Sequence, residues 1–323
     1  MSDLVLIGDV GGTNSRFALA ELDGHTIKLH EIQRTPNDGN ADFDSVLGAY
    51  LDQIAVSPKH ALFALAGPVA PDGSVKLINR DWPLIDPGSL RRRFDLQQAW
   101  LVNDFAAMAR AIPQLPSSAF IPILPGTPNP EAPIIVTGPG TGFGISALCP
   151  LPSGRWHVVT GEGGHASYSA RTALEIELKT RMEKEHGYIA TEMVVGGAWL
   201  QAVYDAVSDI HDRPRRKITP DEVIGAAECD DAVAIDVLKL RAQGILNAVG
   251  DLVLINGGHG GAVLTGSVAE ALVPWLKTAA AAQHFFDRGG HSDYVRDVPV
   301  SVLTDSAAPL VGGAALLADK LDP

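Results

Sequence analysis

The stretch GDVGGTN (residues 8–14) follows the apolar run LVLI (residues 4–7) near the amino terminus. Residues 4–10 and 15–22 are apolar and flank a short glycine-rich turn, which predicts two strands joined as a hairpin. Glycine-rich turns after a strand favour phosphate binding, because bare backbone N–H groups can surround anionic oxygens. This turn nevertheless contains an aspartate, Asp9, and no lysine. The role of that negative charge is the first question that the sequence raises.

A second stretch repeats the pattern in the second half of the chain. The apolar run PIIVTG (133–138) leads into a glycine-rich turn and then into ISAL (145–148), with Gly140-Thr141 matching Gly12-Thr13. Neither turn is a Walker P-loop, since both lack the required lysine, and the glycine spacing in GPGTGFG (138–144) is not that of a Rossmann fingerprint. For either turn alone, the alternative is that its glycines only allow a tight hairpin turn and bind no phosphate. We interpret the pair as a weak internal duplication, with one hairpin in each lobe.

The remaining patterns predict an α/β protein. Further strands are expected at residues 60–66, 99–104 and 262–267, the last running into a turn. Helices are expected at residues 105–112, 172–187, 233–255 and 307–321. Strands that alternate with helices favour an α/β fold, and the two hairpins predict mixed rather than purely parallel sheets.

A proline-rich segment divides the chain. At 323 residues the protein exceeds the usual size of one compact core, and seven prolines lie between residues 113 and 133. We interpret this segment as a surface crossing between lobes, because neither an interior helix nor an interior strand tolerates so many prolines. The predicted domains are a small lobe, residues 1–113 with 305–323, and a large lobe, residues 114–304.

Composition excludes several classes of partner. Lys and Arg number 25 against 38 Asp and Glu, a net charge of -13, so nucleic acid is not expected to bind. No apolar run reaches the roughly 18 residues of a membrane span, and we expect neither a secretory leader nor a membrane partner. The two cysteines, Cys149 and Cys229, form no disulfide framework, which fits a reducing cytoplasm.

Four motifs together resemble a known family. GDVGGTNSRFALA (8–20), LVNDFAAMARAIP (101–113), TGPGTGFG (137–144) and TGEGGH (160–165) occur in the order and approximate spacing of bacterial glucokinases. These belong to the wider sugar kinase, Hsp70 and actin superfamily. The resemblance extends over nearly the whole chain and implies a two-lobed actin-like ATPase (ribonuclease H-like) fold with an interlobe cleft. It further implies transfer of the ATP γ-phosphate to the 6-hydroxyl of glucose with Mg²⁺, a homodimer, and no structural zinc.

Asp104 is the candidate catalytic base. A sugar hydroxyl is a poor nucleophile, so a carboxylate has to orient it and take its proton. Asp104 ends the apolar run WLV, where a strand would deliver its side chain to a cleft rim. The alternative is that Asp104 only caps the helix that starts at Phe105. The resemblance assigns it to catalysis.

The sugar would be bound by groups that both accept and donate hydrogen bonds. Asn103 supplies an amide beside Asp104, and the resemblance makes Glu162 and His165 hydroxyl ligands. Their E-x-x-H spacing lies on glycines and occurs once, so a di-metal site is not predicted. Glu192 and Asn79 also match family positions for sugar binding. The sequence after Glu192, VVGGAWL, departs from the family's serine-glycine-proline-glycine turn, so a solvated glutamate at a helix start remains an alternative.

The nucleotide would be bound by the two glycine turns. In the lysine-free turns, Asp9 is expected to hold Mg²⁺ through water, because Mg²⁺ favours one or two carboxylates beside substrate phosphates. A turn residue that bonds its own backbone is the alternative for Asp9. Ser267 follows Gly266 where the family commonly has a glycine pair flanking adenosine. The predicted ATP-binding residues are Asp9, Gly11, Gly12, Thr13, Asn14, Gly138, Gly140, Thr141, Gly142 and Gly266.

Three other functions remain open on the sequence. A kinase for another hexose or an amino sugar is the runner-up, because the departure after Glu192 touches the sugar side. A sugar-binding regulator without catalysis would carry a DNA-binding helix-turn-helix, which this acidic chain does not suggest. An Hsp70-like or actin-like ATPase would share the glycine hairpins but not the NDF and EGGH motifs.

Overall fold

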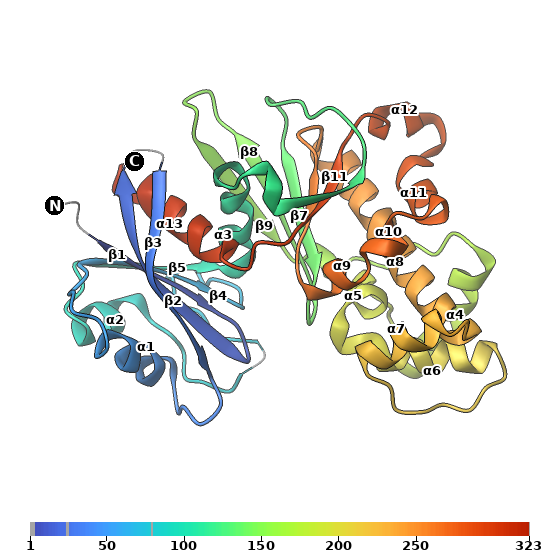
Figure 1. Cartoon of the computed structure of the whole chain (residues 1–323), viewed down its shortest axis with the longest axis horizontal. Helices are drawn as coiled ribbons and strands as arrows, with labels where there is room; N and C mark the ends of the chain where they lie inside the picture. The colour runs from blue at the N-terminus through green and yellow to red at the C-terminus, as the bar shows by residue number, and fades with distance from the viewer. Residues whose placement is uncertain (1–3, 24–25, 79, 323) are drawn as a thin grey trace. The chain divides into compact units, whose positions relative to one another are not determined.

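The computed structural model describes residues 4–23, 26–78 and 80–322 (Figure 1). Asn79, a predicted sugar ligand, lies outside the described residues. Compactness divides the chain into two units: a first unit of residues 1–117, 151–160 and 305–323, and a second unit of residues 118–150 and 161–304. The predicted lobes and the cleft between them stay a prediction.

The first unit is built on a five-stranded mixed sheet with the order β3-β2-β1-β4-β5. Its strands are β1 (Val5–Val10), β2 (Asn14–Asp23), β3 (Thr26–Pro36), β4 (His60–Leu65) and β5 (Gln98–Asn103). The first three form an antiparallel meander, and β1, β4 and β5 run parallel. The helices are α1 (Phe43–Leu51), α2 (Pro87–Arg93), α3 (Asp104–Ala111) and α13 (Ala308–Leu321).

The alternating side chains of β1 show how both faces of this sheet are covered by helices. Leu6 and Val10 join the core under α1 and α2, whereas Val5 and Ile7 join the core under α13, because successive side chains of a strand point to opposite faces. Figure 1 shows these helices against the two faces. Gly8 is required by close packing, since a Cβ there would lie 2.6 Å from the Phe63 ring.

The second unit repeats the strand pattern in a sheet with the order β6-β11-β10-β7-β8-β9. Its own strands are β6 (Phe120–Leu124), β7 (Ile134–Pro139), β8 (Phe143–Pro150), β10 (Ala262–Leu264) and β11 (Val300–Leu303). The sixth strand of the sheet, β9 (Trp156–Gly161), consists of residues that the division by compactness assigns to the first unit, except Gly161. The hairpin β7-β8 is antiparallel, and β7, β10 and β11 run parallel, as β1, β4 and β5 do. This shared topology supports the internal duplication inferred from the sequence.

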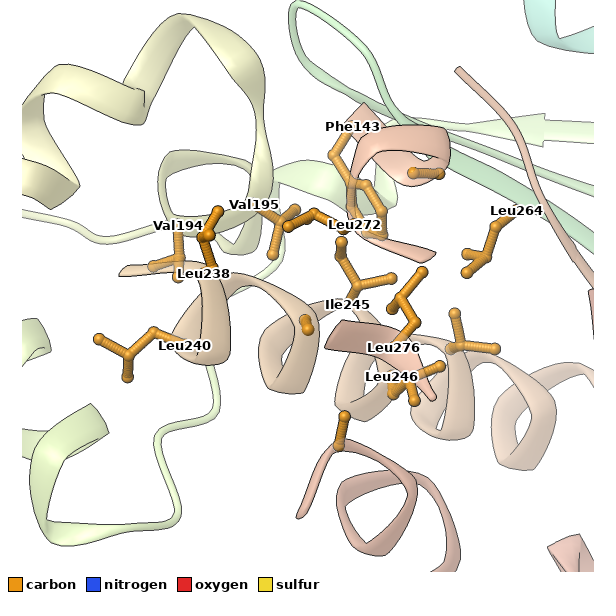
Figure 2. Close-up of a cluster of buried hydrophobic side chains, with 14 of the residues drawn as sticks. Phe143, Val194, Val195, Leu238, Leu240, Ile245, Leu246, Leu264, Leu272 and Leu276 are labelled. Atoms are coloured by element: carbon orange, nitrogen blue, oxygen red, sulfur yellow. The ribbon is translucent and has the colours of Figure 1, made fainter. Parts of the chain in front are cut away.

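A long buried helix organises the core of the second unit. Helix α8 (Ala232–Asn256) starts at the N-cap Asp231, whose side chain accepts from Ala234 N–H, and ends at Gly257 in the left-handed conformation. Figure 2 draws Ile245 of α8 in one apolar cluster with Phe143 and Leu272, which come from β8 and the segment after α9. The start of β8 is therefore fixed by the core.

The other helices of the second unit surround α8. They are α4 (Ala173–His186), α5 (Thr191–Val195), α6 (Leu200–Ile210), α7 (Pro220–Glu228), α9 (Ser267–Ala271), α10 (Val273–Leu276), α11 (Ala279–Phe286) and α12 (Ser292–Val295). The second unit also has the 3₁₀ turns η3 (Gly163–His165), η4 (Gly197–Trp199) and η5 (Gly289–His291). The turn η1 (Ile112–Gln114) belongs to the first unit, and η2 (Ser117–Ala119) lies at the boundary between the units in the sequence. No helix of the described residues is both long and apolar enough to cross a membrane.

The predicted elements are confirmed with one correction. The α/β class, the mixed sheets and all four predicted helices are present, although one helix starts at Asp104 rather than Phe105. The interpretation of residues 113–133 as only a surface crossing was wrong, because β6 lies within them. This strand includes Pro122 and is the edge strand of the sheet beside β11, where a proline removes no ladder bond from a second neighbour.

Candidate functional site

The first glycine turn is held by a buried asparagine that the sequence analysis missed. The amide Nδ2 of Asn37 donates to the carbonyl of Gly11 at 2.8 Å, and its Oδ1 accepts from the Ser15 hydroxyl at 2.7 Å. The backbone N–H of Asn37 donates to Thr13 O at 2.8 Å, and Gly11 N–H closes the turn on Asn14 O at 3.0 Å. Asn37 is fully buried, so these bonds lie out of water.

An arginine holds the next carbonyl of the same turn. Arg80 donates from Nη1 to Gly12 O at 3.0 Å and from Nη2 to Asn37 O. Its guanidinium lies 4.7 Å from the centre of the Trp82 ring and pairs with Asp38 at 3.1 Å. The fork geometry of arginine allows these simultaneous bonds. No local pattern identifies Arg80 or Asn37, because each acts on residues far away in the sequence.

Asp9 lies on β1 beside this turn. It is opposite Arg16 on β2, and the two side chains approach to 3.7 Å. Burial raises the pKa of Asp9 to about 6, although the positive charge of Arg16 acts in the opposite direction. Within the described ranges there is no group of three or more His, Cys, Asp or Glu side chains arranged to hold a metal ion. A single carboxylate nevertheless fits Mg²⁺, which keeps several waters and takes its other ligands from phosphates.

The end of β5 presents Asn103 and Asp104. Asn103 is the N-cap of α3, since its Oδ1 accepts from Phe105 N–H at 3.0 Å, and its Nδ2 donates to Gly67 O at 3.2 Å. Asp104 occupies the first helical position, and its Oδ1 also accepts from Phe105 N–H at 2.9 Å. Asn103 is therefore the N-cap residue, and the Asp104 carboxylate shares the same N–H donor. A carboxylate in the first turn of a helix is stabilised in its charged form by the helix dipole.

The second glycine turn is packed against β10. A Cβ on Gly138 would lie 2.0 Å from the carbonyl oxygen of Thr265, so only glycine fits there. Gly266 has φ +95° and lies against Pro139, whose oxygen would be 2.9 Å from a Cβ. Gly140 N–H closes the turn on Gly142 O at 3.0 Å. The predicted nucleotide residues Gly138, Gly140, Gly142 and Gly266 are thus brought together.

Backbone groups hold the carbonyls of the second turn. Gly197 N–H donates to Gly140 O at 2.7 Å, and Ala198 N–H donates to Thr141 O at 3.0 Å. In a trans peptide the C=O and the following N–H point in opposite directions. Donors to the carbonyls of Gly140 and Thr141 therefore turn the N–H groups of Thr141 and Gly142 away from residues 197–198.

The same geometry applies to the first turn. Asn37 and Arg80 bind the carbonyls of Gly11 and Gly12, which turns the N–H groups of Gly12 and Thr13 outward. Over residues 4–23, 26–78 and 80–322, neither these two N–H groups nor those of Thr141 and Gly142 have a protein acceptor. Each turn thus presents a pair of neighbouring amide donors, the arrangement that binds anions.

Glu192 lies against the second turn. It belongs to α5, and its Oε2 accepts from Phe143 N–H at 2.8 Å. Glu192 does lie at a helix start, as the alternative to a sugar ligand supposes, but it is half-buried and one of its carboxylate oxygens has this backbone partner. The VVGG departure places Gly196 and Gly197 where a Cβ would lie 2.8 Å from the carbonyls of Glu192 and Gly140, respectively.

Glu162 directly precedes the 3₁₀ turn η3, and His165 is the last residue of that turn. Both residues are exposed, and the glycines between them allow the turn to lie on β8. A Cβ on Gly164 would lie 2.2 Å from Phe143 O, and one on Gly163 would lie 2.8 Å from Ile145 Cδ1. Phe143 thus contacts both η3 and Glu192. The turn η3, the Glu192 carboxylate and the second glycine turn therefore meet around one residue of β8.

An apolar cavity of about 220 Å³ adjoins the second turn. Gly197 and Ser267 line it together with apolar side chains of α6, α7, α8 and α9. Arg241 is buried in its wall and donates from Nη2 to Val195 O at 2.7 Å, and burial lowers the pKa of this arginine to about 10. Asp221 and Arg241 add charged groups to its otherwise largely apolar lining.

Comparisons with known proteins agree with this geometry. The model of the glucokinase family matches residues 6–320. A glucokinase of Mesorhizobium japonicum is 36% identical over 313 residues, which cover 96% of this chain and 90% of that protein. Among solved structures, a glucokinase from an Antarctic psychrotroph superposes with a TM-score of 0.88 at 29% identity, covering 99% of this chain and 100% of that one.

The fold extends to more distant sugar kinases. A ROK-family glucokinase from Streptomyces griseus superposes with a TM-score of 0.65 at 18% identity, covering 97% and 98% of the two chains. The two mixed sheets, each with a glycine hairpin followed by parallel strands, form the actin-like ATPase fold of these proteins. Because the family model spans nearly all of the sequence, this chain belongs to the glucokinase family.

Proposed function

We propose that this chain transfers the γ-phosphoryl group of ATP to the 6-hydroxyl of glucose, with Asp104 as the base. The observation that carries the proposal is the pair of glycine turns, each presenting two outward amide donors, in a chain whose net charge is -13. In so acidic a protein, a polyphosphate has to be bound by local donors of this kind.

The two turns divide the binding of ATP. Gly12 and Thr13 donate to phosphate oxygens from the first unit, and Thr141 and Gly142 donate from the second. The Thr13 and Thr141 hydroxyls are further donors to phosphate, and both residues are exposed. The apolar cavity beside Ser267 receives the adenine ring, so the serine at that position contributes to nucleotide preference.

Asp104 removes the proton of the attacking hydroxyl. A bond forms between the 6-oxygen of glucose and the γ-phosphorus, the bond from that phosphorus to the β–γ bridging oxygen breaks, and the hydroxyl proton passes to the Asp104 carboxylate. The bond from Phe105 N–H fixes the orientation of this carboxylate, and the start of α3 favours its charged form. The products are ADP and glucose 6-phosphate.

Asp9 holds the magnesium ion that accompanies ATP. When bound, the ion would neutralise charge on the phosphates, and Asp9 would hold it through water. Because the pKa of Asp9 is raised to about 6, the carboxylate is mostly ionised at neutral pH and becomes protonated in mild acid. Metal binding at Asp9 should therefore weaken in mild acid.

The sugar is bound by Asn79, Asn103, Glu162, His165 and Glu192. The Asn103 amide already accepts from Phe105 N–H and donates to Gly67 O, so it offers the sugar its second lone pair and its second hydrogen. Glu162 and His165 are exposed and carry an acceptor and a donor or acceptor, respectively. We also propose a homodimer in the cytoplasm, for which sedimentation of the purified protein and fractionation of cells are the tests.

The test is a coupled assay of ADP release over a panel of hexoses, amino sugars and nucleotides. We expect release with glucose and ATP, and a loss of release when Mg²⁺ is chelated. Release only with another hexose or with an amino sugar would replace glucose by that substrate. No release with any sugar, alongside measurable glucose binding, would favour a binding protein instead.

A further inference from the structure

The Glu192 carboxylate contacts the second glycine turn directly, and the proposed function leaves this contact without a role. We propose that Glu192 positions the second glycine turn for nucleotide binding and joins that turn to the sugar. This inference rests on the proposed function, because it assigns a second task to a residue of the proposed sugar set.

The bond from Phe143 N–H to Glu192 Oε2 at 2.8 Å orients the peptide between Gly142 and Phe143. Since the C=O and N–H of that peptide point in opposite directions, Gly142 O is turned toward Gly140 N–H, which donates to it at 3.0 Å. Glu192 thus sets the hydrogen bond that closes the turn.

The carboxylate fits closely against the turn. A Cβ added to Gly142 would lie 2.4 Å from Glu192 Oε2 and 3.5 Å from Oε1, so the glycine admits the carboxylate and any larger residue displaces it. The segment after α5 continues the contact, because Gly197 and Ala198 donate to the carbonyls of Gly140 and Thr141. Gly196 N–H in turn donates to Glu192 O at 2.7 Å. The carboxylate and the two donors therefore act on the same turn from one short segment.

One carboxylate has two oxygens and accepts on both. With Oε2 committed to Phe143 N–H, Oε1 accepts a sugar hydroxyl. The Glu192 side chain then binds both a sugar hydroxyl and the closed turn. Sugar binding and nucleotide binding therefore favour each other. By linkage, the gain in nucleotide affinity caused by sugar equals the gain in sugar affinity caused by nucleotide.

Titration calorimetry with a non-hydrolysable ATP analogue and Mg²⁺, without sugar, tests the positioning role. We expect Glu192→Ala to weaken analogue binding about tenfold, the size of effect that loss of a hydrogen bond to a charged group produces. Glu192→Gln retains a carbonyl acceptor for Phe143 N–H, and we expect its analogue affinity to stay within about twofold of the unmodified protein. Glu162→Ala, which alters only the proposed sugar set, is the matched control and should also stay within about twofold.

A second variant approaches the same contact from the turn. Gly142→Ala displaces the carboxylate, and we expect it to weaken analogue binding to a similar degree. In the double variant Gly142→Ala with Glu192→Ala the two losses should not add, because both remove one interaction. Melting temperatures of all variants establish that each is folded before binding is compared.

The outcomes separate this inference from the proposed function. If the unmodified protein does not bind the analogue, the proposed function fails. If it binds the analogue and Glu192→Ala binds equally well, Glu192 is a sugar ligand only and the positioning role is wrong. Additive losses in the double variant would likewise overturn the shared contact.

Discussion

The turn at residues 11–14 and the turn at residues 140–142 present the same pattern of outward amides, yet different groups hold their carbonyls. In the first turn, the side chains of Asn37 and Arg80 donate to Gly11 O and Gly12 O. In the second, the backbone N–H groups of Gly197 and Ala198 take that place. In both turns the N–H of each peptide points away from its bound C=O, so each turn presents a pair of amide donors.

The comparison also separates the charges. The first turn has a carboxylate on the preceding strand, Asp9, which faces Arg16 and a proposed metal. The second turn has a carboxylate from a distant helix, Glu192, which accepts from the turn itself. The backbone of the two turns can therefore stay similar while the groups that bind it differ. Each turn carbonyl needs a hydrogen-bond donor, and that donor need not come from a particular residue type.

The largest expected effect is a loss of turnover on substitution of Asp104, the proposed base, which belongs to neither glycine turn. Asp104→Asn keeps the volume and the acceptor for Phe105 N–H but cannot take a proton, so turnover should fall about 10³-fold. Glucose affinity measured by calorimetry should change little. Asp95→Asn, at an exposed carboxylate paired with Lys59, is the control and should retain full turnover. Comparable rates in the Asp104 variant would remove the base assignment.

The next effect concerns the support of the second turn by β10. Gly138→Ala places a Cβ 2.0 Å from Thr265 O and should lower the free energy of unfolding by about 3 kcal/mol, because two backbones have to separate. Gly140→Ala meets no atom within 4 Å and is the matched control. Denaturant unfolding measures both. Equal stability of the two variants would show that the close approach to β10 is not required.

The support of the first turn predicts a smaller change, in nucleotide affinity. Arg80→Ala removes the donor to Gly12 O and should raise the KM for ATP about tenfold with little change in the KM for glucose. Arg80→Lys keeps the charge but loses the fork, so it should recover only part of the affinity. Full recovery by lysine would mean that charge, and not the orientation of the carbonyl, is what matters.

The smallest effect is the pH dependence set by Asp9. Its pKa of about 6 in the folded protein lies above the ordinary aspartate pKa of 3.8, so its contribution to stability is present below pH 3.8 and is lost as pH rises through about 6. Asp9→Asn removes this ionisation, so the variant should gain stability relative to the parent protein between about pH 4 and 7.

The same ionisation predicts the metal requirement. At limiting Mg²⁺, activity of the parent protein should fall as pH drops below about 6, since a protonated Asp9 cannot hold the metal. The Asp9→Asn variant should need more Mg²⁺ for activity at pH 7.5, and its activity at limiting Mg²⁺ should not show this fall below about pH 6. An unchanged Mg²⁺ requirement would favour the alternative in which Asp9 only stabilises its own turn.

The parts of this fold that could be predicted from the sequence are those with local patterns. Apolar runs and glycine turns identified β1, β2 and β7, and the periodic helix α8 was identified within one residue at each end. The segment with Pro122 was misread because a proline argues only against interior strands, and the sequence does not say which strand forms an edge.

The site shows the same limit. Asp104 and the glycine turns could be proposed from the chain, since each motif is contiguous. Asn37 and Arg80 could not, because they contact residues 26 and 68 positions away, respectively. Glu192 was placed near the sugar, but its contact with Phe143 N–H, 49 positions away, depends on the tertiary packing of α5 against β8.

The central proposal is that both turns bind the phosphates of one nucleotide. Amide hydrogen exchange resolved by nuclear magnetic resonance, with and without the non-hydrolysable ATP analogue and Mg²⁺, tests it most directly. The account predicts that exchange slows together at Gly12, Thr13, Thr141 and Gly142, while Gly154, in a turn outside the site, is unchanged. Protection confined to one turn at saturating analogue would contradict it.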